Sequence, residues 1–203
     1  MLAQTRHSPA LMRQVRPGCR LLGWLCALLI YAVPLPVPAQ PFSVQDARTT
    51  LKDGVYRLDA RLIFKLPKKV LEALDNGVPL TFALDIEVRR PRRYLWDDDI
   101  ASLEQRTTLQ YFALTDQYLL RNLNSGHEAS YFTLSTALRA LGNIHGLPII
   151  DAKLLRPDRH YMVSIRSYLD LESLPVPLRM RAYISRDWWL TSGWYSWDLG
   201  TSG

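Results

Sequence analysis

Two segments of this chain alternate apolar and polar residues over most of ten positions, and this pattern constrains the fold more than any other feature. The first segment runs from Tyr56 to Lys65 and the second from Leu80 to Arg89. Because successive side chains of a β-strand point to opposite faces, each segment has one apolar face and one largely polar face. Such strands are typical of antiparallel sheets with one face on a core and the other in water. The chain is therefore predicted to be mainly β.

Further strands are expected around these two. Asp53-Gly54 favours a hairpin turn between residues 47–52 and the first segment. Thr115-Asp116 favours a second hairpin turn. The other predicted strands cover residues 103–114, 117–123, 161–169, 178–184 and 188–199, with a short one at Ile149-Ile150.

Two short helices are predicted in the connections. Pro67 to Leu74 has a proline near its start and Asn76-Gly77 as a stop signal. Thr133 to Leu141 has Thr133 as a cap and Gly142 after its end. Many short strands with only two short helices favour a single antiparallel β-sandwich (Ig-like), with the helices in its connections.

The first 39 residues have the pattern of an export signal. Four arginines precede an apolar run from Leu21 to Val33, which is shorter than the ~20 residues that a membrane span needs. Val37 and Ala39 are small enough for cleavage before Gln40. We therefore predict a cleavable secretory signal peptide over 1–39 and one domain over 40–203, exported to the periplasm by the general secretory route. An uncleaved anchor is the alternative.

This assignment changes the composition that bears on function. Four of the 25 basic residues and none of the 19 acidic residues lie in the signal, so the net charge of +6 falls to +2 without it. A nucleic-acid partner is therefore not expected. Cys19 and Cys26 also lie in the signal, which excludes disulfides, a thiol nucleophile and a cysteine zinc site from the remainder. No second long apolar run follows, so no transmembrane span is expected after cleavage.

An aromatic tail is the first candidate site. Five aromatic residues lie within ten positions: Trp188, Trp189, Trp194, Tyr195 and Trp197. They could form a stacking platform for a sugar or peptide, or a contact with a membrane interface. A closing strand whose indoles at least partly fill the core, with a bend at Gly193, is favoured over both. The candidate binding residues of the tail are Trp188, Trp194 and Trp197.

A charged connection over residues 89–99 is the second candidate site. Four arginines and the three aspartates Asp97 to Asp99 lie on either side of Tyr94-Leu95-Trp96. Mutual screening of these charges is favoured over a partner-docking loop, and Trp96 and Asp97 are its candidate binding residues. Three successive aspartates lack the spacing of a calcium loop. Asp85 and Glu87 share a polar strand face with Arg89, which favours solvated charge pairs over a catalytic pair.

No catalytic motif is apparent. His127, His145 and His160 do not have the spacing of a helical metal pair. Nucleophile elbows, S-x-x-K pairs and glycine-rich phosphate loops are absent from the sequence. We expect no catalytic residues, no metal site and no cofactor.

Several short stretches resemble a known family. They are Tyr94–Asp97, Leu109–Tyr118, Ala137–Leu141, Leu174–Arg179 and Trp189–Leu199. On these residues the chain resembles the gammaproteobacterial secreted proteins grouped as domain of unknown function 4390, also labelled proline-rich signal peptide proteins. The resemblance covers residues 42–199 and implies an exported single-domain protein without an established activity. Genes of this family often lie beside an envelope sensor kinase, which implies a periplasmic protein partner.

The function expected from the sequence is a non-enzymatic binding or adaptor protein of the cell envelope. An accessory protein of an envelope sensor kinase is the first alternative. An enzyme acting on an envelope polymer, with carboxylates such as Asp85 or Asp97, is the second. Peripheral membrane contact through exposed tail tryptophans is a further hypothesis.

Overall fold

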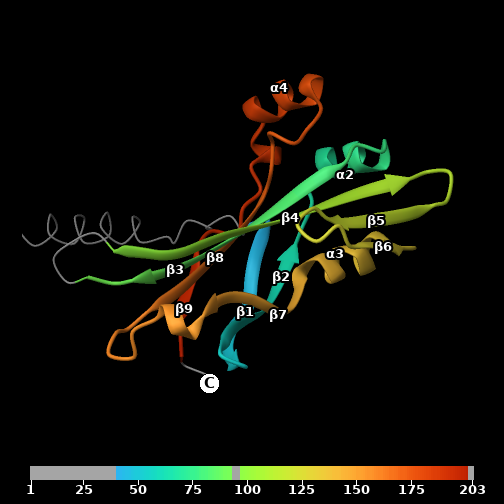
Figure 1. The fold of residues 1–203 in the computed structure, drawn as a ribbon. Helices are drawn as coiled ribbons and strands as arrows, with labels where there is room; N and C mark the ends of the chain where they lie inside the picture. The colour runs from blue at the N-terminus through green and yellow to red at the C-terminus, as the bar shows by residue number, and fades with distance from the viewer. Residues whose placement is uncertain (1–39, 93–96, 201–203) are drawn as a thin grey trace, which may run out of the picture. The chain divides into compact units, whose positions relative to one another are not determined.

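Two antiparallel sheets dominate the computed structural model, which describes residues 40–92 and 97–200 (Figure 1). The first sheet has the order β1-β2-β7, from β1 (Phe42–Lys52), β2 (Val55–Phe64) and β7 (Asn143–Asp151). The second sheet has the order β6-β5-β4-β3-β8-β9. Its strands are β3 (Leu80–Arg90), β4 (Asp98–Phe112), β5 (Gln117–Asn122), β6 (Glu128–Tyr131), β8 (Met162–Leu169) and β9 (Tyr195–Asp198). The prediction of a mainly β fold is confirmed.

Local hairpins build most of the second sheet. Strands β3 to β6 follow one another in the chain and pair in the same order. The predicted turns at Asp53-Gly54 and Thr115-Asp116 join β1 to β2 and β4 to β5. The long-range pairs are β2 with β7, β3 with β8 and β8 with β9, in which Val55 lies opposite Asp151, Phe82 opposite Leu169 and Ile165 opposite Tyr195.

Three α-helices lie in the described residues: α2 (Lys68–Asp75), α3 (Leu134–Gly142) and α4 (Val176–Ile184). Helices α2 and α3 are the two that the sequence predicts. Thr133 caps α3, because its side chain accepts a 3.3 Å hydrogen bond from the Thr136 N–H. None of these described helices has the length and apolar character that crossing a bilayer requires.

Helix α4 corrects one prediction, since residues 178–184 were expected to form a strand. The segment alternates apolar and charged residues, but Leu178 and Ala182 are also spaced for one helix face. Pro177 in the first turn fixes a backbone angle that suits a helix start. Ala182 is fully buried and Leu178 is half-buried, so this helical face is the one that packs.

The tail is not one continuous strand, and it bends at Gly193 as predicted. A 3-10 turn, η2 (Arg186–Trp188), comes first, Thr191 then forms a single bridge to Tyr168 of β8, and β9 pairs with the start of β8. Gly193 has a φ of +68°, a conformation that favours glycine and bends the chain between the two parts. Strand β6 and most of β7 were not predicted.

One hydrophobic core joins the sheets. The rings of Phe42, Phe64 and Phe82 come from both sheets and lie 4.8–5.8 Å apart. Elsewhere the Trp197 Nε1–H donates to Thr49 Oγ1 at 3.3 Å and so connects β9 to β1. The buried cluster runs from Phe42 to Leu199. Because residues 40–200 carry this core themselves, we expect the segment 40–203 to fold on its own.

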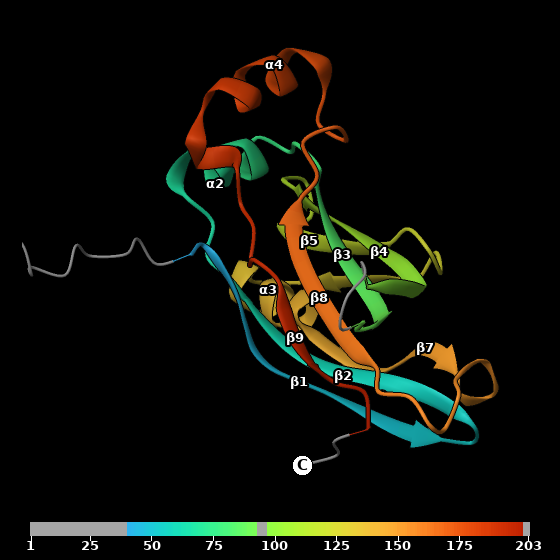
Figure 2. The same ribbon diagram turned by 90° about the vertical axis from the view of Figure 1, so that its left-hand side faces the viewer.

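Helix α3 covers part of the six-stranded sheet that the three-stranded sheet does not reach. It packs on β2 and β7 and on β5 and β6 (Figure 2). Its last residue, Gly142, is buried so closely against β2 that an added Cβ would lie 2.2 Å from the Leu62 carbonyl oxygen. The absence of a side chain at residue 142 therefore sets the distance between helix and strand.

Candidate functional site

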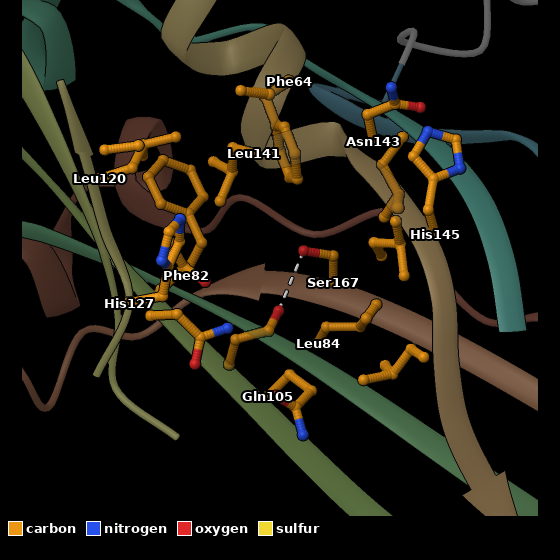
Figure 3. Close-up of a pocket in the computed structure, with 18 of the residues that line it drawn as sticks. Phe64, Phe82, Leu84, Gln105, Leu120, His127, Leu141, Asn143, His145 and Ser167 are labelled. Carbon is orange, nitrogen blue, oxygen red and sulfur yellow. Dashed lines mark hydrogen bonds between the residues drawn. The ribbon is translucent and has the colours of Figure 1, made fainter. Parts of the chain in front are cut away.

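A cavity of about 340 Å³ lies between the two sheets beside α3 (Figure 3). One side is formed by β2, β7 and α3, and the other by β3 to β6 and β8. This volume falls in the range of small-molecule sites, which begins at about 300 Å³. The cavity is thus large enough for a small organic ligand.

The wall formed by β2, β7 and α3 is largely apolar. Leu62 and Phe64 come from β2, Leu141 from α3, and Ile144 and Leu147 from β7. Figure 3 shows Phe64 and Leu141 on the side of the cavity opposite Leu84 and Ser167. The apolar part of a ligand can pack against this wall, and both surfaces are then removed from water.

The facing wall carries a strip of polar residues on the inner face of the six-stranded sheet, where a sandwich core is normally apolar. Leu84 lies opposite both Gln105 and Ser167, and Thr107 lies opposite both Phe82 and Asn122. Residues directly opposite each other in adjacent strands share one face. The polar strip, defined as Gln105, Thr107, Asn122 and Ser167, therefore lies among core residues.

Two members of the polar strip hydrogen-bond to the protein through their side chains, and in the other two the whole side chain has no partner among the described residues. Ser167 Oγ donates to the Ala83 carbonyl at 2.9 Å, and Asn122 Oδ1 accepts from the N–H groups of Asn124 and Ser125. The side chains of Gln105 and Thr107 have no hydrogen-bond partner within residues 40–92 and 97–200. Since half-buried polar groups gain free energy from a partner, they can bind the polar end of a ligand.

Two exposed histidines, His127 and His145, line opposite sides of the cavity (Figure 3). His145 Nδ1 lies 3.6 Å from Asp59 Oδ1, and Asp59 also accepts a 3.0 Å hydrogen bond from the Gly146 N–H. The described lining contains no Asp, Glu, Lys or Arg. In the described part of the chain, no three His, Cys, Asp or Glu side chains are grouped to hold a metal.

The candidate tryptophans of the tail lie in three different surroundings. Trp188 is 4% exposed and belongs to the core, which leaves its indole no surface for a ligand. Trp197 is half-buried and hydrogen-bonded to Thr49. Trp194 is 44% exposed, with the Arg166 guanidinium 4.6 Å from its ring centroid. The three tryptophans thus do not form one platform, and none lines the described cavity.

The charged connection contains the expected pairs of opposite charge. Arg89 Nε lies 2.8 Å from Asp99 Oδ1, and Asp98 pairs with both Arg90 and Arg92. The hydrogen bond from Arg92 is the main reason that the pKa of Asp98 lies below its ordinary value. Candidate Asp97 is exposed and accepts a 3.3 Å hydrogen bond from the Arg92 N–H. Candidate Trp96 lies outside the described residues.

Charge pairing also explains the carboxylates on the outer face of β3. Asp85 accepts a 2.6 Å hydrogen bond from Arg166 Nη2, and Glu87 lies 2.6 Å from Arg89 Nη2. The prediction of charge pairs along this face is confirmed.

The pocket residues were missed by sequence reasoning, although one signal was present. The apolar residues Leu103 and Leu109 lie on the inner face of β4, and the inner-face positions between them are Gln105 and Thr107. Polar residues at two successive core-facing positions of a strand indicate a polar cavity or a site. The coverage by α3 that encloses them could not be predicted from this pattern.

Comparison with known proteins gives a family and no individual relative. No curated protein and no solved structure matches the chain. The Ig-like topology therefore stays a prediction. The family model described as Domain of unknown function (DUF4390) matches residues 39–198, as the resemblance predicts. Because this match spans most of its length, the chain belongs to that family.

Proposed function

We propose that the protein is a non-enzymatic binding protein of the cell envelope, and that its site is the pocket between the sheets. Its ligand is an amphipathic small molecule with an apolar body and an uncharged polar group. The observation that carries this proposal is the pair of unpartnered polar side chains, Gln105 and Thr107, facing an apolar wall.

The apolar wall supports the apolar part of the ligand. Burying each methylene group contributes roughly 0.8 kcal/mol, and Leu62, Phe64 and Leu141 offer surface for several such groups. A charged ligand is disfavoured, because the described lining has no formal charge to pair with it. A hydroxyl, ester or amide can instead exchange hydrogen bonds with the Gln105 amide and the Thr107 hydroxyl.

The hydrogen bonding of the pocket supports binding rather than catalysis. Ser167 donates to a backbone carbonyl and not to a histidine, so its hydroxyl is not activated as a nucleophile is. The envelope location rests on the predicted signal peptide. The accessory role beside a sensor kinase rests on the family resemblance alone and stays a prediction.

Pocket filling tests the site. The segment 40–203 is titrated with N-phenyl-1-naphthylamine, an uncharged probe whose fluorescence rises in apolar surroundings. Ala129 lines the pocket on β6, and we expect Ala129→Phe to weaken probe binding at least about tenfold by occupying the cavity. Ala113→Phe makes the same change in the exposed turn after β4 and should bind as the wild type does. Equal binding by wild type and Ala129→Phe would refute the pocket as the site.

A second variant tests the polar group of the ligand. Gln105→Leu combined with Thr107→Val keeps the side-chain volumes close to the native ones and removes the unpartnered groups. Competition against the probe should show the preference for a long-chain alcohol over the matching alkane falling by roughly 2- to 10-fold, the value of one hydrogen bond. An unchanged preference would show that these side chains do not bind the polar group.

A further inference from the structure

Helix α4 carries an apolar stripe that no other described residue covers. Val176, Met180 and Ile184 are spaced at i, i+4 and i+8, so they lie on one helix face. They are 66%, 68% and 87% exposed. Three large apolar side chains so exposed in one row form a patch rather than isolated surface residues.

The tail extends this stripe at its C-terminal end. Trp189 is 61% exposed, and its Nε1–H donates to the Tyr183 carbonyl oxygen at 3.3 Å. The indole therefore lies at the end of α4, where Tyr183 is also exposed. Tryptophan and tyrosine are the residues that proteins concentrate at the boundary between lipid and water.

The fold of the described residues does not need this stripe. Helix α4 attaches to the protein through its other face, where Ala182 is fully buried and Leu178 is half-buried. Figures 1 and 2 both show α4 clear of the two sheets. No α4 residue lines either of the described cavities, so the stripe is not a wall of a groove.

Two acidic residues beside the stripe are paired with basic ones, and the charges that remain among the described residues there are positive. Glu172 pairs with Arg179 at 3.6 Å, and Asp187 pairs with Lys69 at 2.7 Å. Arg181 and Arg186 are exposed and have no ion-pair partner in the described part of the chain. Exposed apolar side chains next to unpaired arginines match the interface of a bilayer with anionic headgroups.

We propose that α4 and Trp189 form a membrane-docking face, which inserts into the interfacial layer of a bilayer containing anionic lipids. Val176, Met180 and Ile184 enter the boundary between headgroups and acyl chains. Arg181 and Arg186 remain at the level of the phosphates, which their long side chains can reach. This attachment is peripheral and does not depend on the pocket.

Vesicle flotation tests the proposal. The segment 40–203 is mixed with vesicles of phosphatidylcholine alone or of phosphatidylcholine with phosphatidylglycerol. The wild type should float with the anionic vesicles, and Met180→Ser with Ile184→Ser should lower its partition at least about tenfold. Arg181→Gln with Arg186→Gln should lower it by roughly fivefold for each arginine, on anionic vesicles only. With brominated lipids, tryptophan quenching should fall in Trp189→Phe.

Matched variants control for the loss of exposed side chains as such. Leu114 and Phe132 are 102% and 79% exposed away from α4, and Leu114→Ser with Phe132→Ser should float as the wild type does. Arg61 and Arg139 are exposed without a described ion pair, so Arg61→Gln with Arg139→Gln controls for charge.

Three results would overturn the proposal. In the first, the wild type floats with neither kind of vesicle. In the second, the control variants lose as much binding as the α4 variants. In the third, sedimentation shows a dimer that Met180→Ser with Ile184→Ser dissociates, while flotation stays unchanged, which would assign the stripe to a second copy of the chain.

Discussion

Replacement of Gly142 by alanine is expected to destabilise the fold and to weaken probe binding in the pocket at the same time. Gly142 is the last residue of α3, and its neighbours Leu141 and Asn143 line the cavity. The contact with β2 is made through backbone atoms, so no flexible side chain can move aside.

The size of the effect follows from the contact distance. An alanine Cβ would lie 2.2 Å from the Leu62 carbonyl oxygen, whereas real Cβ contacts keep at least 3.0 Å. Helix and strand must therefore separate by about 0.8 Å. Overpacking of this kind costs roughly 1–3 kcal/mol, and the higher helix propensity of alanine returns at most about 1 kcal/mol. We expect a net loss of about 1–2 kcal/mol in the free energy of unfolding.

Urea unfolding of the segment 40–203, followed by tryptophan fluorescence, measures this loss. Titration with N-phenyl-1-naphthylamine measures the pocket in the same preparation. Gly54→Ala is the matched control, because Gly54 has a φ of +77° and no atom within 4 Å of an added Cβ. Its backbone strain should cost about 1 kcal/mol of stability and leave probe binding unchanged.

A Gly142→Ala variant with wild-type stability and wild-type probe binding would refute this reasoning. It would mean that α3 does not depend on close contact with β2. Loss of stability with unchanged probe binding would separate the helix contact from the pocket.

Three further predictions follow from single contacts. Thr133→Ala removes the cap of α3 and should cost about 1 kcal/mol in urea unfolding, whereas Ser135→Ala in the same turn should have a much smaller effect. Phe82→Ala removes a ring that is 2% exposed in the core and should cost roughly 3–5 kcal/mol; a loss below about 1 kcal/mol would contradict the described packing. Arg92→Gln removes the main cause of the low pKa of Asp98, so an NMR titration should show that pKa rising towards its ordinary value. Because the folded pKa of Asp98 is the lower one, its pairing stabilises the fold above about pH 4 and is lost as the pH falls through that pKa.

Strands with one buried and one solvent-exposed face were predictable, because their alternation of apolar and polar residues fits a strand and not a helix. In β3, Leu84, Ile86 and Val88 are buried and the intervening charged residues are not. Residues 178–184 fit two patterns, since Leu178 and Ala182 share a face of a helix while the apolar residues also alternate. Pro177 favours the helix, because its fixed backbone angle suits a first helical turn. The pattern of apolar and charged residues alone does not show this preference.

The site was less predictable than the fold because it depends on packing between distant segments. Gln105 and Thr107 are visible in the sequence as polar residues between Leu103 and Leu109. Their surroundings come from α3 and β7, and β7 was itself hard to recognise because Gly146 and Pro148 interrupt its apolar pattern. Candidate binding residues were instead predicted in the aromatic tail, although Trp188 fills the core and only part of the tail is exposed.

The order of strands in the two sheets has a consequence for folding kinetics. Strands β3 to β6 each pair with the strand that follows in the sequence. The pairing of β2 with β7 instead joins distant segments, with Val55 opposite Asp151. Since the entropy cost of closing a loop grows with its length, we expect the β3–β6 hairpins to form before β7 joins. In stopped-flow refolding, probe binding should therefore appear only in the slowest phase, and its appearance in the first phase would contradict this order. A ligand would then bind the completed domain, and a chain stalled before β7 pairs would expose Gln105 and Thr107 to water.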